Sequence, residues 1–236
     1  MQGQQSRWYF PTRRGLRRIP LEDANALSGP SALLEHPDRG DHIALVYRDD
    51  DFLAESVARF VDSGLRAREG IVVFATLPRW EAIRQRLALG GVDIASAAGR
   101  GQITRVGVHN ILLGWMSGNC SQHAFNQEAG FLVDIQLGNY PAVRVYSELA
   151  DMLLEKNNRV IAAIMQRSWA VYLRGKPVSV LSAWPLNRLD AEGYRTRFES
   201  LCFMHKHVLS EGDPPGVDSL PGSAQQDPVQ KTDDMP

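Results

Sequence analysis

Residues 42–75 read HIALVYRDDDFLAESVARFVDSGLRAREGIVVFA, and this stretch decides the fold. It begins with an apolar run, His42–Tyr47, that is typical of a buried β-strand. Apolar residues then recur at helical spacing from Leu53 to Leu65. Gly70 resets the chain before a second apolar run, Ile71–Ala75. The stretch therefore predicts two buried strands joined by a helix.

The same alternation continues along the chain. Further strands are expected at residues 102–106, 142–146 and 177–184. Helices are expected at residues 78–89, 121–137, 148–156, 159–173 and 191–209, whereas residues 107–120 suit either a loop or a broken helix. Because the strands lie too far apart for hairpins, we predict a three-layer α/β fold. Its sheet is mostly parallel, has five or more strands and carries helices on both faces.

The two ends of the chain differ in charge from the middle. Residues 1–31 hold five arginines against two acids, whereas residues 211–236 hold six acids against one lysine. Eight of the last 26 residues are Pro or Gly, and such a segment buries too little apolar surface to order itself. We therefore expect a flexible basic arm at 1–40, a folded domain at 41–209 and a disordered acidic tail at 210–236.

Composition excludes several classes of protein. The chain has 26 basic and 27 acidic side chains, and this near-neutral balance is not that of a nucleic-acid binder. No apolar run approaches the ~20 residues that span a bilayer, and the arginine-containing N-terminus lacks the apolar core of a secretory signal. Two cysteines form no disulfide framework. We expect a cytoplasmic protein that needs no cofactor and contacts neither membrane nor nucleic acid directly.

The turn after the first strand argues against a triphosphate site. A phosphate-binding loop needs glycines there, because backbone N–H groups must approach the phosphate closely. This turn instead carries three consecutive acids, Asp49, Asp50 and Asp51. Carboxylates at the start of a helix cap its free N–H groups and suit its positive end, so capping is the first interpretation. A magnesium site is the alternative.

A ligand site is expected where the parallel strands end. Parallel sheets bind ligands beyond the carboxyl ends of their strands. Tyr47, Thr76 and Trp184 lie at or near the ends of three predicted strands, and Glu148 follows a fourth. Together they could line an aromatic pocket with a few polar groups, which is the usual character of a small-molecule site. Glu148 fits either a ligand acceptor or base, or an acid that favours a helix N-terminus.

Two Cys-x-x-His pairs raise the question of a metal. They are Cys120 with His123, and Cys202 with His205. Two such pairs would complete a tetrahedral zinc site if they met in space. The alternative is that Cys202 and His205 are a small buried cysteine and a hydrogen-bonded core histidine. No spacing in the sequence brings the two pairs together.

Three blocks of the chain resemble the MEDS family, a sensory domain named for methanogens, methylotrophs and the repressor of dichloromethane dehalogenase. The first block runs from residue 42 to residue 74, the second begins with Arg144-Val-Tyr-Ser-Glu148, and the third joins 180–185 to 201–208. The resemblance covers about residues 41–209. Residues 107–140 fit poorly, and Trp184 stands where a smaller aromatic is expected.

The resemblance implies a RecA-like domain that has lost its phosphate loop. Family members occur beside or fused to sensor kinases, response regulators and DNA-binding domains, so it implies a non-enzymatic module that senses a small organic compound and acts on such a partner. One alternative is a nucleotide-binding or enzymatic RecA-like domain that uses Glu148 and the acids Asp49–Asp51. Another is an adaptor that binds partners through its charged ends. A homo-oligomer is compatible with each of them.

Overall fold

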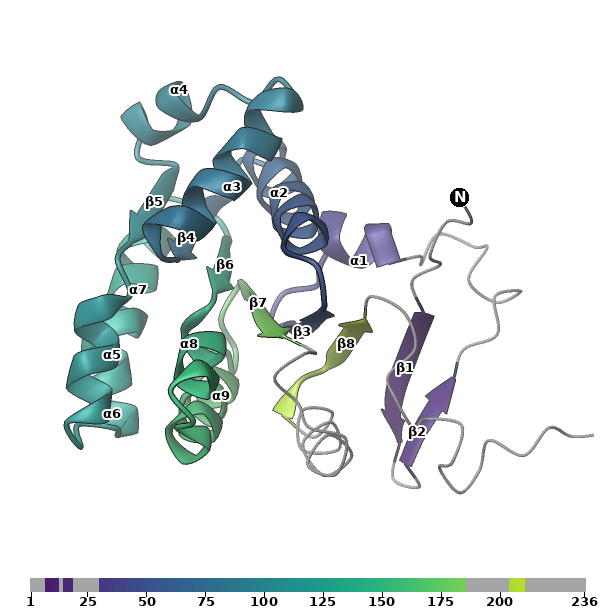
Figure 1. Ribbon diagram of the computed structural model, residues 1–236. Helices are drawn as coiled ribbons and strands as arrows, with labels where there is room; N and C mark the ends of the chain where they lie inside the picture. Colours follow the sequence, from purple (N-terminus) through teal and green to yellow (C-terminus); the bar gives the residue numbers. More distant parts are fainter. Residues whose placement is uncertain (1–6, 13–14, 19–29, 186–203, 211–236) are drawn as a thin grey trace, which may run out of the picture.

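The computed structural model describes residues 7–12, 15–18, 30–185 and 204–210. One eight-stranded sheet runs through these residues in the order β2-β1-β8-β3-β7-β6-β4-β5 (Figure 1). The strands are β1 (Arg7–Thr12), β2 (Gly15–Arg18), β3 (His42–Tyr47), β4 (Gly70–Phe74), β5 (Ile103–Val106), β6 (Val143–Ser147), β7 (Val178–Pro185) and β8 (His207–Ser210).

Six neighbouring strands, from β8 to β5, run parallel to one another. The strands predicted at 42–47, 71–75 and 142–146 lie in this one sheet, as β3, β4 and β6. The antiparallel hairpin of β1 and β2 joins the sheet through β8. The prediction of a mostly parallel sheet of five or more strands is confirmed.

Helices cover both faces of the sheet, which gives the three predicted layers. One face carries α1 (Pro30–Glu35), α2 (Asp50–Arg66), α3 (Leu77–Leu89) and α4 (Ile94–Gly99). The other carries α5 (His109–Met116), α6 (Gln122–Phe125), the π-helical turn η2 (Asn126–Gly130), α7 (Phe131–Leu137), α8 (Leu149–Glu155) and α9 (Arg159–Tyr172).

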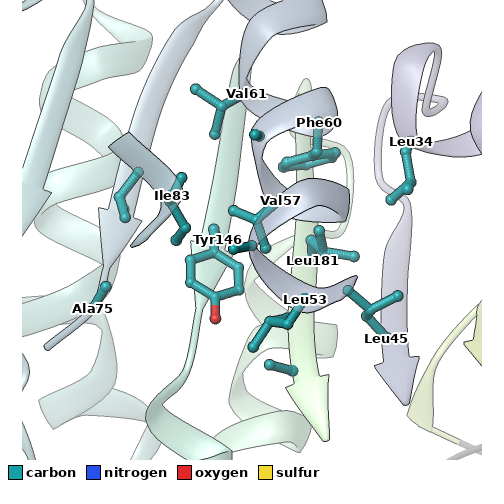
Figure 2. Close-up of a cluster of buried hydrophobic side chains, with 14 of the residues drawn as sticks. Leu34, Leu45, Leu53, Val57, Phe60, Val61, Ala75, Ile83, Tyr146 and Leu181 are labelled. Carbon is teal, nitrogen blue, oxygen red and sulfur yellow. The ribbon is translucent and has the colours of Figure 1, made fainter. Parts of the chain in front are cut away.

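The strands read as continuous apolar runs because both of their faces are buried. Along β4, Ile71 and Val73 point into the core beneath α2 and α3, while Val72 and Phe74 point into the core beneath α8 and α9. Figure 2 shows part of the first core, where α2 lays Leu53, Val57 and Phe60 against the sheet. The segment 107–120, left open between loop and broken helix, contains α5.

Helix α2 approaches the sheet closely at Gly64. A Cβ on this glycine would lie 2.7 Å from Cδ of Arg144 and 2.8 Å from Cδ1 of Ile71. The Arg144 guanidinium is buried there, with an ion pair to Glu69 and hydrogen bonds to the carbonyl oxygens of residues 34, 35 and 60. Arginine on a central strand thus links α1, α2 and the sheet.

Two parts of the chain differ from the sequence prediction. The helix expected at 191–209 is wrong for residues 207–209, which belong to β8 (His207–Ser210). Residues 186–203 lie outside the described part of the chain. Val208 and Leu209 are buried, and they pair with Ala44 and Leu45 of β3. The helical spacing of apolar residues did not determine the secondary structure here. Pairing with the edge of β3 satisfies the backbone hydrogen bonds of this segment and buries the side chains of Val208 and Leu209.

The second difference is at the N-terminal end. Where a flexible arm was expected at 1–40, residues 7–12 and 15–18 form the hairpin and residues 30–35 form α1, whose Leu34 is buried in the core. The predicted acidic tail lies almost wholly outside the described residues, so the domain boundaries remain a prediction. Within the described residues, no helix has the length and apolar content that crossing a bilayer requires.

Candidate functional site

A cleft of about 250 Å³ lies at the carboxyl edge of the sheet, between the first turns of α3 and α8. Two of the predicted site residues line it: Thr76, which follows β4, and Glu148, which follows β6 directly. Its full lining is Asp50, Thr76, Pro78, Arg79, Ala82, Glu148, Asp151, Met152 and Glu155. The site therefore forms where the ends of parallel strands meet, as the topology requires.

Glu148 connects the two helices that flank the cleft. Its backbone N–H donates to the carbonyl oxygen of Phe74 at 3.1 Å, and its carboxylate accepts a hydrogen bond from the backbone N–H of Thr76, the N-cap of α3. A carboxylate is favoured there by the positive end of the helix. Burial raises the pKa of the Glu148 carboxyl, while the hydrogen bonds from Thr76 and the charge of Arg79 oppose that rise.

Arg79 is the centre of the cluster, and sequence reasoning missed it. Its Nη1 lies 2.6 Å from Oδ1 of Asp50, and its Nη2 donates to the Tyr47 hydroxyl at 3.2 Å. Its Nε lies 3.5 Å from Oε2 of Glu148, and its Nη2 lies 3.8 Å from Oδ2 of Asp151. The helix dipole disfavours a positive charge in the first turn of a helix. The position of Arg79 directly after Pro78, at the start of the predicted helix, was therefore the feature of the sequence that could have drawn attention to it.

Tyr47 lies beneath Arg79 and Asp151 rather than in the cleft wall. Its hydroxyl donates to Oδ2 of Asp151 at 2.6 Å, and the Arg79 guanidinium carbon lies 5.5 Å from the centre of its ring. Burial and the neighbouring Asp151 raise the pKa of the Tyr47 hydroxyl. The structure thus brings Tyr47, Thr76 and Glu148 into one charged group, which also contains Arg79 and Asp151.

A second buried tyrosine belongs to this group. Tyr146 of β6 is fully buried, and burial together with the charge of Glu148 raises the pKa of its hydroxyl. Arg79, Tyr47 and Asp151 are its other electrostatic neighbours. Within the described residues its hydroxyl has no hydrogen-bond partner. Tyr146 ends the predicted strand 142–146 and stands two residues before Glu148. The sequence could therefore have indicated that the two side chains lie near each other.

The three consecutive acids have separate tasks. Oδ1 of Asp49 accepts from the backbone N–H of Asp51 at 2.6 Å and caps α2, as the capping interpretation predicts. Asp50 binds Arg79, and Asp51 accepts from Nη2 of Arg86 at 2.7 Å. Two of the acids therefore attach α2 to α3, at the turn where a phosphate loop would hold its ligand.

Trp184 lies apart from the other predicted site residues. Leu181 and Ala183 of β7 point into the core beneath α2, so Trp184 points to the opposite face. Its ring meets that of His205 edge-on at 5.8 Å, and within the described residues its indole N–H has no partner. Trp184 and Tyr47 therefore border different faces of the sheet.

His205 lies in a buried polar group on that opposite face. Its ring lies against that of His42, with 4.1 Å between the centroids and an angle of 40° between the ring planes, and its Nε2 lies 3.1 Å from Oε1 of Gln166 on α9. Nδ1 of His42 lies 3.1 Å from the carbonyl oxygen of Met204, and its Nε2 lies 3.4 Å from the hydroxyl of Ser182. These contacts fasten the segment before β8 to β3, β7 and α9.

The described residues contain no group of three or more His, Cys, Asp or Glu arranged to hold a metal ion. Cys120 is a free, half-buried thiol that packs against the core beneath α5 and α9. Cys202 lies outside the described residues, so the possible zinc site of Cys120, His123, Cys202 and His205 stays untested.

Comparison with known proteins places the chain in a family. The model of the MEDS family, described as the methanogen/methylotroph, DcmR sensory domain, matches residues 41–205. The chain belongs to the MEDS family. The resemblance read from the three sequence blocks is thereby confirmed, and the MEDS match spans β3 to β7, including every residue of the cleft.

Two solved structures are similar to this MEDS domain. A KaiC-like protein from the archaeon Pyrococcus horikoshii OT3 is 14% identical, with a TM-score of 0.47, over 73% of this chain and 71% of that chain. The flagellar accessory protein FlaH from Methanocaldococcus jannaschii is 10% identical, with a TM-score of 0.49, over 86% of this chain and 79% of that chain. No curated protein matches the sequence.

Proposed function

We propose that this MEDS domain is a non-catalytic sensory module that binds a small organic molecule in the cleft between α3 and α8. Binding of the ligand in this cleft changes the activity of a regulatory partner, which is a sensor kinase, a response regulator or a transcription factor. The observation that carries the proposal is the position of Arg79, which reaches from α3 to Asp50 on α2 and to Glu148 and Asp151 at the start of α8. A ligand beside Arg79 acts on three elements at once.

The character of the cleft supports a small ligand. Its volume of about 250 Å³ lies just below the usual range for drug-sized molecules. Pro78, Ala82 and Met152 supply apolar surface, and Thr76 and Glu148 supply polar groups beside it. This mixture favours a compact molecule with an apolar body and a single polar end.

The contacts of Glu148 support the absence of catalysis. Its carboxylate accepts from the N–H of Thr76 and faces Arg79, so it is engaged in joining helices. Among the described residues, no serine, cysteine or lysine lines the cleft, and the one lining hydroxyl, that of Thr76, belongs to the N-cap residue of α3, which binds Glu148 through both its side chain and its backbone N–H. The acids at 49–51 would repel a triphosphate from the first strand-to-helix turn. We expect calorimetric titration of the full chain with ATP and magnesium to give no heat, whereas saturable binding would favour the nucleotide alternative.

A cleft-filling variant tests where the ligand binds. Compounds that raise the melting temperature of the full chain are collected by thermal-shift screening, and each is repeated on Met152→Trp. We expect the indole to fill the cleft and abolish these shifts. Val160→Trp is the matched control, because Val160 is exposed on α9. Compounds that stabilise Met152→Trp and the parent chain equally would contradict the proposed site.

A further inference from the structure

We infer that the cleft takes an organic cation, an ammonium or guanidinium group on a short apolar body, and that this cation displaces Arg79 from Glu148 and Asp151. The inference rests on the proposed function and names the chemical class of the ligand. Arg79 then serves as an internal substitute for the ligand, held in the site while the site is empty of other cations.

The charge of the lining is the first observation. Asp50, Glu148, Asp151 and Glu155 are acids, and Arg79 is the basic residue among the lining residues. The side chains of Glu148 and Asp151 are almost fully buried, with 3% and 5% of their surface exposed. Carboxylates removed from water gain strongly from an added positive charge, because little solvent screens it.

The distances around Arg79 are the second observation. Its short contact, 2.6 Å, is to Asp50, whose side chain is 77% exposed. Its contacts to the buried carboxylates are long, 3.5 Å to Glu148 and 3.8 Å to Asp151, beyond normal hydrogen-bond length. Arg79 is thus held closely by Asp50 at the surface and by the buried Tyr47 hydroxyl at 3.2 Å, but only loosely by the two buried carboxylates. A smaller cation that enters the cleft can approach both buried carboxylates more closely than the guanidinium does.

The unpaired hydroxyl of Tyr146 is the third observation. Its hydroxyl points along the strands toward their carboxyl ends (Figure 2). It is fully buried, without a hydrogen-bond partner in the described residues, and Glu148, Arg79 and Asp151 are its electrostatic neighbours. Tyr146 is not among the residues that line the cleft, and it lies behind Glu148 and Arg79, which do. Unpaired buried hydroxyls are costly, so one beside these lining residues indicates a place for a donor that arrives with the ligand.

Displacement also gives a route for the signal. When Arg79 leaves Glu148 and Asp151, it can remain on Asp50 and extend into solvent. The ion pairs that Arg79 makes from α3 to the start of α8 are then broken, and the hydrogen bond from the Thr76 N–H to Glu148 remains between them. Helices α2 and α3 stay joined through Arg86 and Asp51. The position of α3 relative to α8 then differs between the free and the bound protein, and this difference is what a partner recognises.

Three probes of equal length and different charge test the ligand class. n-Butylammonium, n-butanol and butyrate are titrated into the full chain at neutral pH, and binding is followed by NMR chemical-shift changes. We expect the ammonium to bind at least roughly ten-fold more tightly than the alcohol, as charge-assisted hydrogen bonds to buried carboxylates require, and the carboxylate to show no binding.

Matched variants test the residues. Glu148→Gln and Asp151→Asn should each weaken ammonium binding by roughly ten-fold or more, whereas Arg79→Gln should strengthen it, because the internal competitor is gone. Glu81→Gln is the control, since this acid of α3 pairs with Arg84 outside the cleft. Circular dichroism checks that each variant is folded. If Glu148→Gln does not fold, the ammonium affinities of Asp151→Asn and Arg79→Gln still test the inference.

The outcomes separate this inference from the proposed function. Absence of ammonium binding, or alcohol binding as tight as ammonium binding, overturns the cationic ligand, while compounds lost on Met152→Trp would still support the sensory cleft. Weaker ammonium binding in Arg79→Gln overturns displacement. Equal thermal shifts in Met152→Trp and the parent chain would instead remove the site itself.

Discussion

Two buried tyrosines face the same charged group with different consequences. The Tyr47 hydroxyl donates to Asp151 at 2.6 Å and accepts from Arg79, so both of its roles are filled. The Tyr146 hydroxyl has no partner in the described part of the chain. A phenol oxygen therefore stabilises the fold at one position and leaves a buried dipole unpaired at the other.

Removing each hydroxyl should separate the two tyrosines. We expect Tyr47→Phe to lower the free energy of unfolding by about 1.5–3 kcal/mol, because a buried carboxylate loses a hydrogen bond. Tyr146→Phe should leave stability unchanged or raise it slightly, since no bond is lost. Urea unfolding of the ligand-free full chain measures both. A larger loss for Tyr146→Phe than for Tyr47→Phe would contradict the assigned contacts.

At the scale of elements, one glycine controls how closely a helix meets the sheet. The hydrogen at Gly64 lets α2 approach Arg144 and Ile71, and the many bonds of Arg144 prevent that side chain from moving aside. Gly99, at the end of α4, has nothing within 4 Å of the place where a Cβ would stand. The two helical glycines therefore form a matched pair.

Alanine at these glycines should have opposite effects. Gly64→Ala should lower the free energy of unfolding by roughly 1–3 kcal/mol through overpacking, despite better helix propensity. Gly99→Ala should be neutral or stabilising by up to about 1 kcal/mol, because only the propensity changes. Chemical denaturation of both variants checks this. A stable Gly64→Ala variant would mean that α2 can move away from the sheet at little cost.

For the whole molecule, stability should depend on pH through His42. Burial and the charge of His205 hold the pKa of His42 well below its ordinary value of 6.5. Below that pH the unfolded chain takes up a proton that the folded chain refuses, so stability should fall by up to about 1.4 kcal/mol per pH unit. The groups that face His42 are His205, Gln166, Ser182 and the Met204 carbonyl.

His42→Gln isolates this contribution. Its unfolding free energy, measured between about pH 7 and pH 5, should fall less steeply than that of the parent chain. The raised pKa of Glu148 acts in the opposite direction, because its carboxyl takes up a proton more readily when folded, but it acts equally in both proteins. Parallel curves for the two proteins would show that His42 does not control this part of the pH dependence.

Much of this architecture was predictable from the sequence, for a physical reason. Strands buried on both faces must be apolar throughout, so runs such as His42–Tyr47 and Ile71–Ala75 stand out from amphipathic helices. Strand β8 was mistaken for a helix because four residues are too few to show a period of two. What made it a strand is the free edge of β3, which no local pattern reveals.

The candidate site was predictable in place but not in composition. Tyr47, Thr76 and Glu148 lie together at one edge of the sheet, because each stands at or just after the end of a parallel strand; their role in binding a ligand stays a prediction. Trp184 was placed with them because it ends a strand, although an alternating strand turns successive side chains to opposite faces. Arg79 and Asp151 lie within helices, and they come together because of the way α3 and α8 pack. The spacing of residues along the chain carries no information about that packing.

The order of the strands in the sheet has a consequence for folding during synthesis on the ribosome. Among the strands that the structure describes, the hairpin of β1 and β2 is made before the others, yet its neighbour in the sheet, β8, is made after them. The strands from β3 to β7 can pair once residue 185 has been delivered, whereas β1 must wait until residue 210 leaves the exit tunnel. Throughout that interval the edge of β3 and the hairpin are both exposed to wrong partners, so the final step of folding comes only after translation has passed β8.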